Sequence, residues 1–103
     1  MLSRIDDPLA LTGNGSVSVC GPIRWEANEQ TADFGFILRQ EDRLLVGRSS
    51  AAQGTLMWMG TNLRRTGGRF QAGPATGTVV SVVRRSAGLP VVTATWTQEV
   101  ELV

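Results

Sequence analysis

The clearest periodicity in the chain runs from Val91 to Leu102, where apolar and polar residues alternate. One set of alternate positions is apolar except for Gln98, and the other set, after Val91, consists of threonines followed by two glutamates. The apolar set is Val92, Ala94, Trp96, Val100 and Leu102. Because successive side chains of a strand point to opposite faces, this pattern predicts a half-buried strand. At about 3.3 Å per residue the strand spans about 40 Å, so we expect a long C-terminal hairpin.

Shorter segments of the same kind fill most of the remaining chain, and Gly, Pro and Asn residues separate them. We predict further strands at Ser16–Cys20, Ile23–Asn28, Asp33–Gln40, Leu44–Arg48, Thr55–Met59 and Thr78–Arg85. We expect a break at Gly21-Pro22, a tight turn at Gln40–Arg43, loops at Ser49–Gly54 and Gly73–Gly77, and a hairpin tipped by Gly67-Gly68 within Asn62–Ala72. The only helix signal is Asp7-Pro8, which resembles an N-cap followed by Pro at the first helical position.

These elements predict one all-β domain over residues 1–103, in which residues 1–14 form an N-terminal arm or a short helical turn. With about seven or eight short strands, the expected architecture is a small antiparallel β-barrel or a two-sheet sandwich. The segment Thr55–Met59 is apolar on both faces. It therefore predicts either a central strand or a strand that a partner covers.

The composition restricts the chemistry that the chain can perform. It contains no His, Lys or Tyr, so the usual general base and the Schiff-base nucleophile are missing. Its one cysteine, Cys20, cannot form a disulfide within the chain or complete a standard zinc site, and we interpret it as a small buried residue. We therefore predict no enzyme activity, no metal and no cofactor. No apolar run has the length of a signal peptide or a membrane span, which predicts cytoplasmic synthesis and no membrane partner.

The charges are segregated along the chain, although the net charge is only +1. Residues 1–42 carry seven acidic residues and three arginines, whereas residues 43–98 carry seven arginines and no acidic residue. Three interpretations are open. Acidic and basic segments pair across the sheet, or they form opposite sides that suit head-to-tail assembly, or the arginines bind an anionic partner such as nucleic acid.

We predict a non-catalytic structural or assembly subunit that acts through protein–protein contacts, as a homo-oligomer or with a protein partner. A low charged fraction of 18% and the segregated charges favour it. Its most concrete form is a phage or virion component, such as a tail, connector or decoration protein. The candidate partner-binding residues are Arg64, Arg65, Arg69, Arg84, Arg85, Met57, Trp58 and Met59, with Trp58 or Met59 as an anchor.

Two alternatives use the same residues differently. A small β-barrel that binds nucleic acid would use the same arginines. A barrel that holds a small ligand would line its mouth with Trp25, Trp58 or Trp96.

Overall fold

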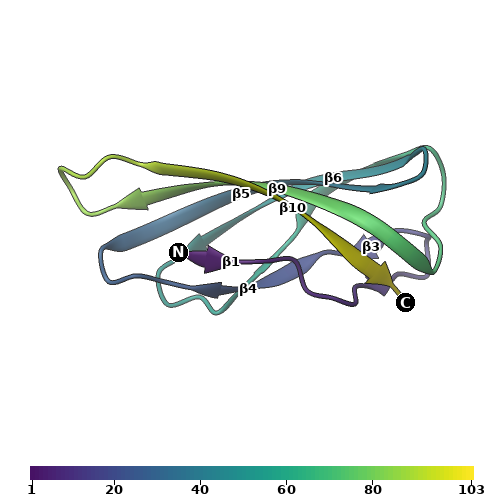
Figure 1. Cartoon of the computed structure of the whole chain (residues 1–103), viewed down its shortest axis with the longest axis horizontal. Coiled ribbons are helices and arrows are strands. Elements are labelled where there is room, and N and C mark those ends of the chain that lie inside the picture. Colours follow the sequence, from purple (N-terminus) through teal and green to yellow (C-terminus); the bar gives the residue numbers. More distant parts are fainter.

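A computed structural model describes all residues, 1–103, and shows an all-β protein without helices (Figure 1). Its ten strands lie in sheets whose pairs are antiparallel. In chain order they are β1 (Leu2–Ser3), β2 (Ala10–Leu11), β3 (Val17–Ser18), β4 (Cys20–Arg24), β5 (Glu29–Gln40), β6 (Arg43–Ala52), β7 (Met57–Met59), β8 (Thr61–Thr66), β9 (Gly73–Arg85) and β10 (Val92–Leu102). No helix is present that is long and apolar enough to cross a membrane.

The main sheet has five strands in the order β10-β9-β5-β6-β8. Its long strands are buried on one face only, because apolar side chains alternate with polar ones along them. On β5 the inward residues include Phe34, Phe36 and Leu38, and the outward ones include Asp33 and Arg39. The sheet is elongated, and the molecule measures 45 × 21 × 19 Å along its principal axes.

Two small sheets cover the inner face of the main sheet. One has the order β1-β4-β7, and the other pairs β2 with β3. Figure 1 shows β1, β3 and β4 in a layer of their own, beside the layer of β5, β6, β9 and β10. The strands do not close into a barrel. Of the two predicted architectures, the sandwich is therefore confirmed and the barrel is wrong.

An aromatic cluster fills the centre of the core. The ring of Trp58 stacks on Phe34 at 5.3 Å between centroids and lies 5.8 Å from Phe36. Gly47 and Gly60 make room for Phe36, because a Cβ at either glycine would lie 2.6 Å from its Cζ. The main sheet and the small sheet therefore meet through large rings packed against positions without side chains.

The N-terminal segment is bonded to the C-terminal strand. The side chain of Gln98 bonds both main-chain groups of Ile5, accepting from its N–H at 2.8 Å and donating to its carbonyl at 2.9 Å. Leu9 forms an isolated parallel bridge with Leu102. The terminal amino group of Met1 lies 2.7 Å from the carboxylate of Glu29, and both groups are buried. Residues 1–11 therefore belong to the sandwich.

Several predicted elements are confirmed. The C-terminal strand runs from Val92 to Leu102. Its predicted inner side is partly or fully buried from Trp96 onward, whereas Val92 and Ala94 are exposed. Gln40–Arg43 forms the tight turn between β5 and β6. Thr78–Arg85 lies in a strand that pairs on both sides, with β10 and β5. The strands predicted at Asp33–Gln40 and Leu44–Arg48 are present and extend further than predicted.

The predictions for the N-terminal third contain four errors. The segment Ser16–Cys20 is not one strand, because β3 ends at Ser18 and Cys20 begins β4. Asp7-Pro8 does not start a helix: its peptide bond is cis, and Ala10–Leu11 form β2. Gly21-Pro22 does not break a strand but lies inside β4, where a Cβ on Gly21 would lie 1.8 Å from the carbonyl oxygen of Arg4. This glycine therefore permits a close approach of two strands rather than a turn. The strand predicted at Ile23–Asn28 ends at Arg24.

The predicted loops and hairpin in the second half are also partly wrong. Ser49–Ala52 continue β6, because small inward residues are accommodated in the core. The segment Gly73–Gly77 belongs to β9, and Gly77 makes room for the side chain of Ile5. The chain turns at Gly67-Gly68, but no return strand follows. Phe70 is buried instead, and its N–H donates to the carbonyl of Gly15 at 2.8 Å.

Candidate functional site

The outer face of the small sheet exposes apolar side chains. Register places Pro22 opposite Met57, and Leu2 lies on the same face one strand away. Leu2 is 68% exposed, Met57 49% and Met59 59%. We call Leu2, Pro22, Met57 and Met59 the apolar face. Methionine is flexible and polarisable and is frequent at surfaces that bind proteins, so this composition suits a contact surface.

The alternation of β7 explains why its central residue lies elsewhere. Met57 and Met59 point outward, so Trp58 points into the core, where it is 1% exposed. Its indole N–H donates to the hydroxyl of Ser3 at 2.9 Å. Trp58 therefore holds the two sheets together and is not the exposed anchor that the sequence suggested, whereas Met57 and Met59 are accessible.

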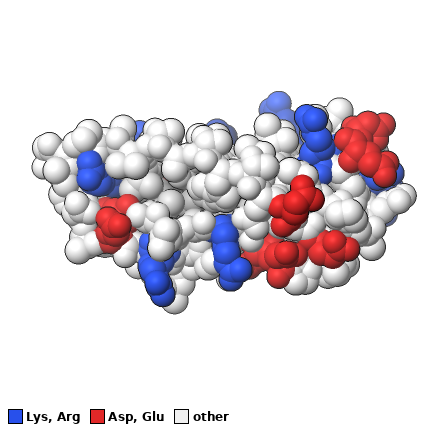
Figure 2. All heavy atoms as spheres, in the orientation of Figure 1, with Lys and Arg blue, Asp and Glu red and all other residues white.

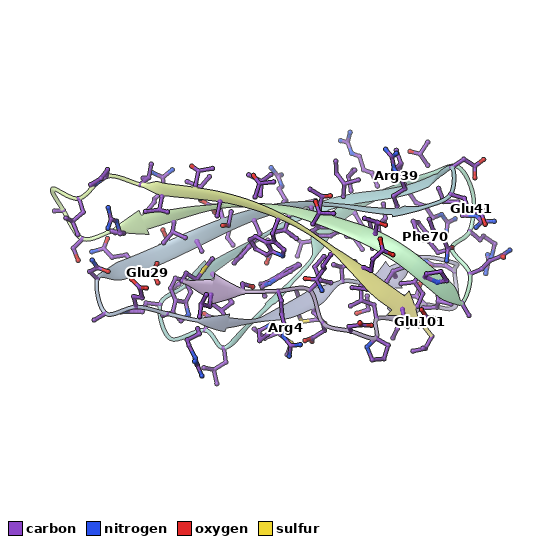
Figure 3. The ribbon with its side chains drawn as sticks, viewed as in Figure 1. Arg4, Glu29, Arg39, Glu41, Phe70 and Glu101 are labelled. Carbon is purple, nitrogen blue, oxygen red and sulfur yellow. The ribbon has the colours of Figure 1, made fainter.

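Two arginines flank the apolar face. A shallow depression of about 360 Å³ lies between β1 and β4, and Arg4 and Arg24 line it beside Leu2 and Pro22. Figure 3 shows Arg4 pointing away from the main sheet, while Arg39 extends from the opposite side of the molecule. Neither Arg4 nor Arg24 has a carboxylate within 4 Å. This side of the molecule thus combines apolar side chains with free positive charge.

Cys20 lies beside Met59 in the register of the small sheet. It is half-buried, and its Sγ donates to Oδ2 of Asp6 at 3.4 Å. Desolvation raises the pKa of the thiol above its usual value of 9.0, and the hydrogen bond to Asp6 and the charge of that carboxylate raise it further. The thiol therefore stays protonated at neutral pH, where it is a weak nucleophile.

The five predicted arginines do not form one basic side. Arg64, Arg65 and Arg69 lie near the turn between β5 and β6, whereas Arg84 and Arg85 end β9 at the opposite end of the sheet. Along β5, the positions level with Arg64 and Arg84 are six residues apart, which corresponds to about 20 Å.

Three of the five arginines bond to main-chain carbonyls. Arg65 donates to Asn14, Arg69 donates to Gly13 at 3.0 Å, and Arg85 donates to Pro90 at 2.9 Å. These bonds tie β8 and the loop after it to the turn after β2, and they fix the end of the β9–β10 hairpin. Arg65, Arg69 and Arg85 therefore have a structural role, and Arg64 and Arg84 have no such partner.

Cross-strand ion pairs do not neutralise the arginines. The only arginine with a carboxylate within 4 Å is Arg43, which lies 3.8 Å from Glu41 on the same turn. Figure 2 shows most acidic side chains of the visible face over the end of the molecule where β10 ends. The interpretation that acidic and basic segments pair across the sheet is therefore wrong. Figure 2 also shows arginines beside these acidic side chains, so the segregation of charge along the chain does not carry over to the surface.

The three tryptophans do not line a common pocket. Trp58 is in the core, and Trp25 donates its indole N–H to the carbonyl of Thr55 at 2.7 Å. Trp96 is half-buried on the inner face of β10, and its indole nitrogen has no partner. Because the barrel is absent, the predicted mouth for a small ligand is absent too. The chain also has no group of three or more acidic or cysteine residues placed to hold a metal ion.

Sequence reasoning missed one part of this surface and one feature of the main sheet. Leu2 and Pro22 join Met57 and Met59 only because β1 and β4 pair with each other and with β7. The free edge of β10 was also missed, since alternation marks a strand but not its neighbours. No protein family, curated protein or solved structure matches this chain.

Proposed function

We propose that this protein is a non-catalytic assembly subunit that binds a protein partner through the apolar face. The observation that carries the proposal is the exposure of Met57, Met59 and Leu2 on one regular sheet face. Other large apolar residues are exposed as well, such as Ile37 and Val80 on the main sheet, whereas Trp58 between the two methionines is fully covered. Exposed apolar side chains that gather on one face are typical of protein contact surfaces.

The chemistry of the face indicates the kind of partner. Burying apolar surface contributes about 25 cal/mol per Å², so covering the methionines and Leu2 supplies a large part of a binding energy. Arg4 and Arg24 lie at the rim without carboxylate partners. A partner with an apolar centre and acidic residues around it is therefore complementary.

The distribution of the arginines weighs against the nucleic-acid alternative. A phosphate backbone is bound by several cations along one surface, whereas Arg64 and Arg84 are displaced by about 20 Å along the strands and lie on different strands, β8 and β9. Arg65 and Arg69 are already bonded to main-chain carbonyls. The narrower prediction of a virion or phage particle component stays a prediction.

The proposal is tested on the tagged chain in its source cells. Size-exclusion chromatography of the extract should place the wild-type chain in a complex much larger than a dimer. The double substitution Met57→Gln/Met59→Gln should move it to the size of a monomer or a dimer, because each lost anchor weakens binding by about 1–2 kcal/mol. Val103→Gln is the matched control, since Val103 is 62% exposed outside the face. A wild-type chain that elutes without a partner contradicts the proposal.

A further inference from the structure

The outer edge of β10 presents main-chain groups that nothing in the chain satisfies. The carbonyl of Glu101 accepts from Leu9 at 2.9 Å, and the N–H of Glu101 donates to Asp7 at 2.9 Å, so this residue faces away from β9. Because alternate residues of a strand direct their main-chain groups to the same side, Thr93, Thr95 and Thr97 face outward as well. No hydrogen bond from elsewhere in the chain reaches those groups.

The open part of this edge is suited to strand pairing. The N-terminal segment covers β10 only at Glu101 and beyond. From Val91 to Thr97 the edge holds valine, threonine, alanine and tryptophan, without a charge or a proline. The hairpin of β9 and β10 also extends past the small sheet, as Figure 1 shows. A long regular edge of this composition is a template for another strand.

We propose that the occupant is a second copy of this chain, paired antiparallel through β10 about a two-fold axis at Thr95. Residues whose main-chain N–H and C=O groups point away from β9 must lie opposite each other. Thr95 therefore pairs with Thr95 of the second copy, and Thr93 pairs with Thr97 of the second copy. The two main sheets become one continuous sheet. On the inner face, Val92, Ala94 and Trp96 of both copies come together, and Val92 is 44% exposed in the single chain.

Charge complementarity selects this register and this partner. With the axis at Thr95, Glu99 lies opposite Val91 of the second copy. Continuing the β9–β10 register by one residue places Val91 beside Arg84, on the same outer face as Glu99. Glu99 and Arg84 of the second copy are then two strand spacings apart, about 10 Å between Cα atoms, which long side chains can bridge.

Both charges are available for this contact. Arg84 is exposed and has no carboxylate within 4 Å, and Glu99 accepts only from the hydroxyl of Thr76 at 2.7 Å. Because the dimer has two-fold symmetry, the pair between Glu99 and Arg84 forms twice. An axis at Thr97 would instead bring the second copy against the segment that already occupies the edge at Glu101. The surface of the chain is therefore complementary to itself.

This inference rests on the proposed function for its assembly role, but it concerns a different surface. The apolar face lies on the outer side of the small sheet, and the β10 edge belongs to the main sheet. Either contact can exist without the other, so a variant of one surface tests that surface alone.

The main test is sedimentation of the purified chain from about 1 μM to about 500 μM. The wild-type chain should form a dimer, and Thr95→Pro should raise the dissociation constant at least about 100-fold, because it removes the outward N–H at the axis. Thr95→Ala keeps the main chain and should leave the dimer unchanged. A wild-type chain that is monomeric at the highest concentration overturns the inference.

A charge exchange tests the register without a proline. Glu99→Arg alone and Arg84→Glu alone should each raise the dissociation constant about tenfold, and the double exchange should restore it to within about threefold. Met57→Gln/Met59→Gln should not affect the dimer. If that double variant abolishes the dimer while Thr95→Pro and Glu99→Arg preserve it, the chain pairs through the apolar face and the β10 inference is wrong.

Discussion

The two edges of the main sheet differ in ways that decide whether another strand can be added. β8 is irregular: Asn62 has a φ of 52°, and the register with β6 shifts between Val46 and Arg48. It also carries Arg64 and Arg65. β10 pairs with β9 without a shift and carries no charge from Val92 to Thr97. Charge and irregularity are the features that protect sheet edges, so β8 is closed and β10 is open.

Two adjacent positions of β10 test this difference between the edges most directly, and a proline substitution there should give the largest change in folding stability. The N–H of Ala94 faces β9, whereas that of Thr95 faces outward. Ala94→Pro should lower the free energy of unfolding by about 3 kcal/mol, because it removes a bond inside the sheet. Thr95→Pro should lower it by less than about 1 kcal/mol in the monomer.

Urea denaturation of both variants at a concentration below dimer formation measures the difference. Equal losses of stability for the two prolines would show that β10 does not have an open side. The proline at the outward position would then no longer be a clean probe of dimer formation.

The packing of β8, the closed edge, should be sensitive to one added methyl group. A Cβ on Gly47 would lie 2.6 Å from Phe36 Cζ and 2.7 Å from Leu63 Cδ2, the latter on β8. Gly47→Ala should therefore cost about 1–3 kcal/mol through overpacking where β8 joins the sheet. Gly35→Ala is the control, because its Cβ would have no atom within 4 Å, and it should be neutral or slightly stabilising. Thermal unfolding of both variants distinguishes them, and equal melting temperatures would contradict this account.

The smallest effect should come from removing the charges of β8. Arg64→Thr/Arg65→Thr should change folding stability by no more than about 1 kcal/mol, since both side chains are exposed and one bond to Asn14 is lost. In a chain whose β10 edge carries Thr95→Pro, the double substitution should create new, concentration-dependent association through β8. Light scattering measures it, and unchanged scattering would show that the irregular backbone closes this edge without the arginines.

The strands that could be predicted are those whose alternation repeats over many residues. Val92–Leu102 starts one residue after the expected Val91 and ends as expected, and its apolar side is buried at Val100 and Leu102, where a shift by one residue would expose it. Gly21 and Gly77 were misread as turn or loop residues, since a glycine in a sequence does not show whether it bends the chain or lets a neighbour approach. Arg4 and Ile5 are those neighbours, and they come from a distant segment.

The candidate surfaces could also be predicted only in part. The methionines of β7 were found because they stand out locally, but the burial of Trp58 between them depends on Phe34 and Phe36 across the core. The five arginines are close in sequence yet lie at two ends of the sheet. The reason is that β9 runs the length of the sheet beside β5 and carries Arg84 and Arg85 to the far end.

Local pattern was therefore enough to specify an all-β chain and its long C-terminal strand, since these follow from side-chain alternation and composition. Strand order, the identity of the open edge and the assembly of the apolar face required the folded chain. They depend on which distant segments pair, and pairing is a property of contacts across the sheet that no single segment contains.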